Sequence, residues 1–123
     1  MEWHKNLYVG ASILQKQKKI KWKIMHNQLQ LRVYVIALAA NEQNLLDIIP
    51  SRELLQKHYP KRDIYIIGLA GHYNEALELA GHIVSEVYRA TGGFDIRSYI
   101  RSGGNSREER LYGMRQAQGK QKL

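Results

Sequence analysis

The sequence predicts a small α+β domain in which helices pack on a mixed, three-stranded sheet. The chain has 123 residues, about the length of one domain, and its apolar share of 44% is sufficient for a core. Two apolar runs, 33–40 and 64–70, are rich in β-branched residues, as strands covered on both faces are. Residues 73–90 repeat their apolar side chains at helical spacing. The expected order is helix, strand, strand, helix, strand, helix.

The first helix is expected over about residues 13–27, with Ser12 as its N-cap. Ile20 and Ile24 belong to an apolar stripe along one side of this helix. Much of the remaining surface is basic and consists of Lys16, Lys18, Lys19, Lys21 and Lys23. The following segment, 29–40, is predicted to be the central strand of the sheet.

A polar break at 41–44 precedes a second apolar stretch, 45–49, so these two strands are expected to form a hairpin. Pro50 lacks a backbone N–H, which predicts that the second strand stops at the edge of the sheet. A short helix from Ser51 must end before Pro60. We expect it to form a right-handed crossover to the third strand at 64–69.

The helix over 73–90 is expected to end at Gly92 and Gly93. Residues 94–100 fit two structures, a final strand or a turn of helix that begins at Asp95, and both remain open. The compact domain is therefore expected to span residues 1–100.

The remainder, 101–123, is predicted to be a flexible basic tail. It holds six of the 19 basic residues, two of the 11 acidic ones and little apolar content. Ser106 and Glu109 offer a capping box for one short helix over 107–116.

Composition excludes several classes of protein. Without cysteine, disulfides, thiol catalysis and Cys-ligated metals are excluded, and a reducing compartment is permitted. The longest apolar run has eight residues, whereas a bilayer span needs roughly 20, so we expect a soluble protein with no membrane partner. The N-terminus has no signal-peptide pattern. We therefore expect the protein in the cytoplasm.

The stretches LDIIPSRELLQKHY, DIYIIGLAGHYNEALELAGHIVSEVY and RATGGFDIRSYI resemble a family of small bacterial proteins of unassigned function. The resemblance covers roughly residues 5–100 and leaves out the tail. It implies a compact bacterial domain and supplies no catalytic residue.

Gly68, Gly71 and His72 lie where the third strand turns into the long helix, and backbone N–H groups at such a turn can bind an anion. A phosphate loop needs Lys and then Ser or Thr after its glycines, which this chain lacks. The plainer interpretation is that the glycines permit a tight turn. An enzyme with a phosphate-type ligand at this turn is our third functional hypothesis.

No sequence pattern indicates catalysis or a metal. The histidines lack the HExxH spacing, and no GxSxG nucleophile motif occurs. Glu78, His82 and Glu86 are interpreted as a solvated face of the long helix. We therefore predict no catalytic residue, metal or cofactor.

Trp22 stands among the lysines of the first helix, with Met25 and His26 on the same side. An aromatic ring within positive charge suits stacking on a base beside a phosphate. It equally suits a tryptophan packed against the sheet beneath lysine stems. Both interpretations remain open.

The leading functional hypothesis is a non-enzymatic domain that acts by binding protein or itself. A homodimer is expected because Leu79, Ile83 or Val87 can be left for a partner chain. The second hypothesis is nucleic-acid (polyanion) binding through the lysine-rich helix and, in the tail, Arg107 and Arg110, in line with the net charge of +8.

Overall fold

The computed structural model describes residues 1–39, 45–57 and 64–103. Its helices and strands are, in chain order, β1 (Glu2–Val9), the 3₁₀ helix η1 (Ala11–Lys16), α1 (Gln17–Met25), β2 (Tyr34–Leu38), β3 (Leu46–Pro50), the 3₁₀ helix η2 (Ser51–Leu55), β4 (Tyr65–Ala70), α2 (Tyr73–Thr91) and α3 (Ile96–Arg101). The α+β class is confirmed. Among these helices, none is both long enough and apolar enough to cross a bilayer.

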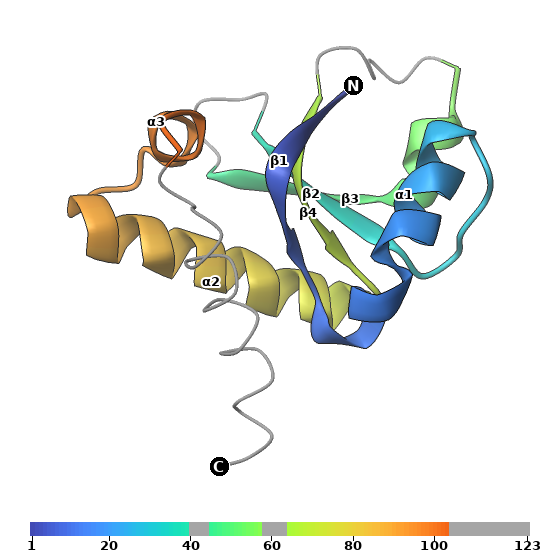
Figure 1. Cartoon of the computed structure of the whole chain (residues 1–123), viewed down its shortest axis with the longest axis horizontal. Helices are drawn as coiled ribbons and strands as arrows, with labels where there is room; N and C mark the ends of the chain where they lie inside the picture. The colour runs from blue at the N-terminus through green and yellow to red at the C-terminus, as the bar shows by residue number, and fades with distance from the viewer. Residues whose placement is uncertain (40–44, 58–63, 104–123) are drawn as a thin grey trace.

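The sheet has four strands in the order β1-β4-β2-β3 (Figure 1), so the prediction of three strands was wrong. The missed strand, β1, pairs parallel with β4, whereas β2 is antiparallel to both β4 and β3. Polar Lys5 and Asn6 interrupt the apolar pattern of β1, and its register with β4 shifts between Trp3 and Tyr8. The irregular strand is therefore weakly marked in the sequence.

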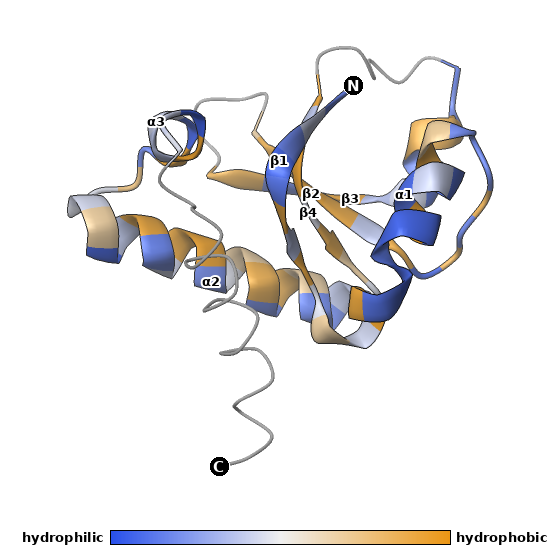
Figure 2. Cartoon of the chain, in the orientation of Figure 1, coloured by the Kyte–Doolittle hydropathy of each residue, from blue (hydrophilic) through white to orange (hydrophobic). Residues whose placement is uncertain are grey.

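Helices cover both faces of the sheet (Figure 1). The first core lies on the side of α1 and includes Val9, Ile20, Ile24, Val35 and Leu69. The second lies on the side of α2 and α3 and includes Tyr8, Ile36, Ile67, Leu79, Ile83, Val87 and Ile100. In Figure 2, α2 carries a strongly hydrophobic stripe and α1 is mostly hydrophilic. Alternate residues of β2 enter each core, which confirms that both its faces are covered.

The start of the first helix was predicted wrongly. Residues 11–16 form the 3₁₀ helix η1, and α1 begins only at Gln17. Ser12 makes no N-cap bond, because its hydroxyl donates to a carboxylate oxygen of Glu75 at 2.7 Å. The central strand is also shorter than expected, since residues 29–33 form a connection before β2.

The hairpin of β2 and β3 is confirmed, with Tyr34 opposite Pro50, and β3 is an edge strand of the sheet. Because β3 and β4 lie on either side of β2 and both run antiparallel to it, the chain crosses over β2 between them. The helix expected from Ser51 is the short η2, and residues 58–63 of the crossover lie outside the described residues.

One predicted helix boundary is confirmed, and one alternative that the sequence left open is decided. Gly92 ends α2 with a left-handed φ of 74°, and its N–H bonds to the carbonyl of Tyr88. Residues 96–101 form α3, not a strand, because the Asp95 side chain accepts a bond from the N–H of Ser98. The tail, with its expected helix over 107–116, lies outside the described residues, so the domain boundary near residue 100 stays a prediction.

The three residues expected to face a partner chain are instead covered by the chain itself. Leu79, Ile83 and Val87 are buried in the core beneath α2. α3 and the sheet together supply more cover for α2 than a three-stranded sheet was expected to provide. These three residues therefore give no reason to expect a dimer.

Candidate anion-binding surface

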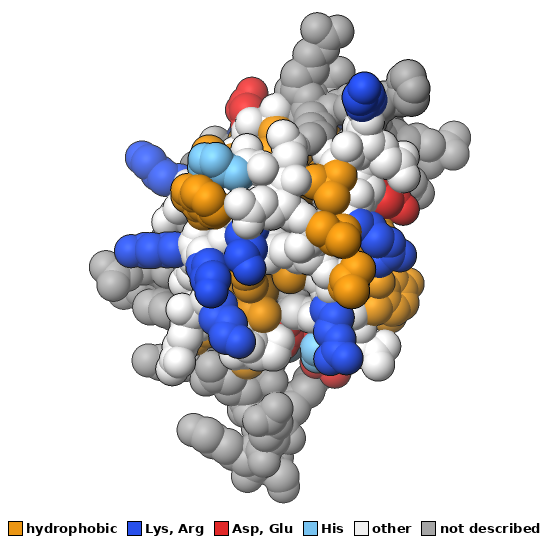
Figure 3. Space-filling model, turned by 90° about the vertical axis from the view of Figure 1, so that its right-hand side faces the viewer, with side chains coloured by type: hydrophobic (Ala, Val, Ile, Leu, Met, Phe, Trp, Pro, Cys, Tyr) orange, Lys and Arg blue, Asp and Glu red, His pale blue; other side chains and the backbone are white. Residues whose placement is uncertain are grey.

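The outer surface of α1 and of the connection from α1 to β2 combines positive charge with large apolar side chains. We call this surface the basic face and define it as Lys16, Lys18, Lys19, Lys21, Trp22, Lys23, Met25, His26, Leu29, Leu31 and Arg32. In Figure 1, α1 lies on the right-hand side of the molecule. Figure 3 shows that side, with Lys and Arg side chains set among hydrophobic ones and few acids.

The lysines reach solvent because only one side of the short helix α1 packs on the sheet. Ile20 and Ile24 are buried in the core and fix this side. The five lysines predicted as candidates are exposed or partly buried, namely Lys16, Lys18, Lys19, Lys21 and Lys23. No Asp or Glu occurs from residue 3 to residue 41, so no acid of this segment offsets their charge.

Trp22 is 51% exposed, so it is not packed against the sheet. Its ring stacks on that of His26, with centroids 4.0 Å apart and an angle of 21° between the planes. The packed tryptophan of this region is Trp3 in β1, which contacts the core, and the Nζ of Lys21 lies 5.1 Å from its ring centroid. Of the two interpretations left open by the sequence, the structure agrees with the exposed ring and not with a tryptophan packed against the sheet.

Two leucines of the basic face were missed. Leu29 and Leu31 are 60% and 70% exposed, although the sequence placed them in the central strand. Between them, the side-chain amide of Gln30 donates to the backbone carbonyl of Ile20. The backbone carbonyl of Gln30 accepts from the Ser51 hydroxyl at 3.1 Å. Because Gln30 is held against α1 and η2, its two neighbours project away from the protein.

The three residues predicted to form one anion-binding turn, Gly68, Gly71 and His72, do not all lie in that turn. Gly68 lies inside β4, where an added Cβ would come within 3.0 Å of the Tyr8 carbonyl oxygen, so this glycine allows β1 to approach closely. Gly71 and His72 do form the turn into α2. The Gly71 N–H donates to Oε1 of Glu75 at 2.7 Å, and His72 caps α2 by accepting a bond from the Glu75 N–H. The interpretation as a plain turn therefore holds for Gly71 but not for Gly68.

Glu75 lies at the crevice where the parallel strands β1 and β4 end. Their following helices cover opposite faces of the sheet, an arrangement that often binds ligands. Here the carboxylate also accepts from the N–H and the hydroxyl of Ser12, at 3.0 and 2.7 Å, beside a hollow of about 440 Å³. Partial burial raises the pKa of Glu75, but the bonds from Gly71 and Ser12 outweigh burial and hold that pKa below 4.5. The chain's own carboxylate thus occupies the donors that a phosphate would use.

Glu86 is buried, so its assignment to a solvated helix face was wrong. The hydroxyls of Tyr8 and Tyr99 donate to its Oε2 at 2.5 and 3.0 Å. Helical spacing already indicated this, because Glu86 is three residues after Ile83 and next to Val87 on the apolar side of α2. The carboxylate joins β1, α2 and α3 inside the second core.

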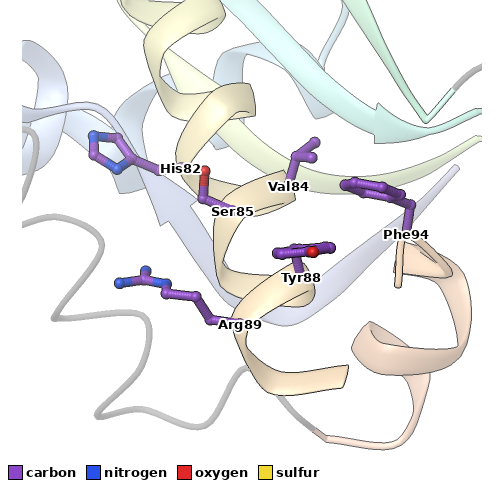
Figure 4. A pocket seen from close by; sticks show the side chains of 6 residues that line it. All are labelled: His82, Val84, Ser85, Tyr88, Arg89 and Phe94. Carbon is purple, nitrogen blue, oxygen red and sulfur yellow. The ribbon is translucent and has the colours of Figure 1, made fainter. Parts of the chain in front are cut away.

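A second hollow, of about 460 Å³, lies beside the last turns of α2 (Figure 4). The rings of Tyr88 and Phe94 stack there with centroids 5.1 Å apart, and about half of each side chain is exposed. Figure 4 shows Val84 near this pair, with His82 and Arg89 on the other side.

Comparisons with protein-family models, curated proteins and solved structures give no match. The resemblance to a small bacterial family therefore stays a prediction. Arg107 and Arg110 lie outside the described residues. Within the described ranges, no group of three or more His, Cys, Asp or Glu side chains is arranged to hold a metal ion. The function is inferred from the surfaces described above.

Proposed function

We propose that the protein is a non-enzymatic binding domain that holds an anionic partner on the basic face. The observation that carries this proposal is the half-exposed Trp22 ring, stacked on His26 among lysines in a segment without acids. The lysines supply attraction for phosphate groups, and the ring supplies a flat apolar contact. This function corresponds to the second hypothesis from the sequence, nucleic-acid or polyanion binding, and not to the first, the binding of another protein or of a second copy.

The enzyme hypothesis receives less support. It needs donors for a phosphate at the turn before α2, and the Gly71 N–H and both Ser12 donors already bond to Glu75. A ligand there would have to displace a carboxylate that is ionised at neutral pH. In contrast, residues 3–41, which include the basic face, contain no Asp or Glu that could compete with an anionic ligand for the lysines.

Reversing one charge of the basic face should weaken binding strongly. We expect Lys19→Glu to lower the affinity for anionic probes by about tenfold, because each base near an anionic surface contributes about 1 kcal/mol and the new acid is repelled. The matched control is Arg101→Glu on α3, across the sheet from α1, which should change affinity less than about twofold. Titration with a 20-nucleotide oligo(dT) and with anionic lipid vesicles, at two salt concentrations, measures both effects. Equal losses in the two variants would contradict the proposal.

Self-association is a second candidate function, favoured by the Tyr88–Phe94 pair. A flat aromatic surface that is half exposed can stack on its own copy across a two-fold axis. The neighbouring exposed residues include a base, Arg89, and an acid, Asp95, so two copies can place opposite charges together.

Sedimentation of the full chain at high micromolar concentration tests self-association. We expect a dimer that becomes a monomer when Tyr88 and Phe94 are both changed to Ser, with unchanged helix content by circular dichroism. A wild-type chain that sediments as a monomer removes this candidate.

A further inference from the structure

The basic face displays more aliphatic surface than binding to phosphates explains. Besides Trp22, it exposes Met25, Leu29 and Leu31, each more than half accessible to solvent. Exposed clusters of large apolar side chains mark interaction surfaces, because solvent-facing positions tolerate polar residues at no cost. Bases and phosphates stack or pair with aromatic and charged groups but gain little from leucine.

The outward position of the two leucines is built into the fold. The side-chain amide of Gln30, the polar residue between them, donates to the carbonyl of Ile20 on α1, and the backbone carbonyl of Gln30 accepts from the Ser51 hydroxyl on η2. The connection thus reverses the usual arrangement, with the polar side chain against the protein and the apolar ones in solvent. Figure 3 shows hydrophobic side chains on the same face as the lysines.

We infer that the basic face docks on the surface of an anionic phospholipid bilayer, and this inference rests on the proposed function. Trp22, Met25, Leu29 and Leu31 would enter the boundary between headgroups and acyl chains, where tryptophan and aliphatic side chains gain most. The lysines and Arg32 would contact lipid phosphates around them. The single occupant that uses both the charge and the leucines is therefore a membrane surface.

The expectation of no membrane partner followed from the lack of a spanning segment. Docking at the bilayer surface requires none, since the contact is made by side chains of a folded domain. Charge alone gives reversible attraction that salt weakens, and inserted apolar side chains add a component that salt does not screen. These two components can be separated by experiment.

The test is sedimentation of the full chain with vesicles of pure phosphatidylcholine or of phosphatidylcholine with 30% phosphatidylglycerol. We expect binding only to the anionic vesicles. Changing Leu29 and Leu31 together to Gln should lower the partition coefficient at least about tenfold, because two large apolar side chains no longer enter the bilayer. The matched control is Leu77→Gln, an exposed leucine of α2 on the other side of the sheet, which should partition like wild type.

The outcomes distinguish the inference from the function on which it rests. If oligo(dT) binds but anionic vesicles do not, or if the leucine variant partitions like wild type, the lipid inference is overturned and polyanion binding stands. If neither probe binds at 50 mM salt, both are overturned. Thermal melts accompany each variant, and the exposed positions of Leu29 and Leu31 predict unchanged melting temperatures.

Discussion

Replacing Glu86 with alanine is expected to lower the free energy of unfolding by about 4 kcal/mol. The change leaves the hydroxyls of Tyr8 and Tyr99 buried without this acceptor, and each lost partner costs about 1 to 3 kcal/mol. Whole domains of this size are stable by only about 5 to 15 kcal/mol, so the loss is a large share of the total. Denaturant titration of the full chain measures it.

Three variants separate the hydrogen bonds from general damage to α2. Glu86→Gln retains a side-chain oxygen and should cost only about 1 kcal/mol, as should Tyr99→Phe, which removes one donor. Glu78→Ala, at an exposed carboxylate of the same helix, should change stability by less than about 0.5 kcal/mol. A Glu86→Ala chain as stable as Glu78→Ala would show that the buried carboxylate does not join the three elements.

Replacing Glu75 with glutamine is expected to cost about 1 to 2 kcal/mol at pH 7. Three donors, the N–H of Gly71 and both donors of Ser12, bond to the carboxylate, and partial exposure limits the strength of each bond. Burial raises the pKa of Glu75, but these bonds together lower the pKa by more than burial raises it. The pKa of Glu75 in the folded protein therefore lies below its ordinary value of 4.5. The carboxylate therefore stabilises the fold above pH 4.5, and this contribution is lost as the pH falls through the lower, folded pKa.

The stability difference between wild type and Glu75→Gln should accordingly be constant from pH 7 to about pH 5 and shrink below pH 4.5. Glu78→Gln, at an exposed carboxylate of the same helix, provides the control. A difference that grows toward low pH would mean that the donors do not hold Glu75 in its ionised form.

Most elements of the fold could be predicted because their signals are local. The apolar runs of β2 and β4, the helical spacing of α2 and the stop at Gly92 all lie within short stretches of sequence. β1 was missed because its pattern is interrupted by Lys5 and Asn6, and its position beside β4 depends on a partner about 60 residues away. The start of α1 was misplaced because Ser12 bonds to Glu75, a contact that no local pattern reveals.

The candidate surface was predicted in part. The exposure of the lysines followed from helical geometry, whereas the sequence left open whether Trp22 packs on the sheet or faces solvent. Leu29 and Leu31 were read as strand residues, because the bonds that hold Gln30 against α1 and η2 are tertiary contacts that no local pattern shows. Glu86 was misread although its spacing from Ile83 placed it on the apolar side, because a charged residue was assumed to face solvent.

The basic face is where we propose that the protein meets an anionic partner. The most direct measurement is a series of ¹H–¹⁵N spectra of the full chain, recorded while bicelles containing phosphatidylglycerol are added. We predict shifts or broadening concentrated in residues 16–32, with the amides of α2 and α3 unchanged. Changes confined to α2 and α3, or spread evenly over the chain, would contradict the claim.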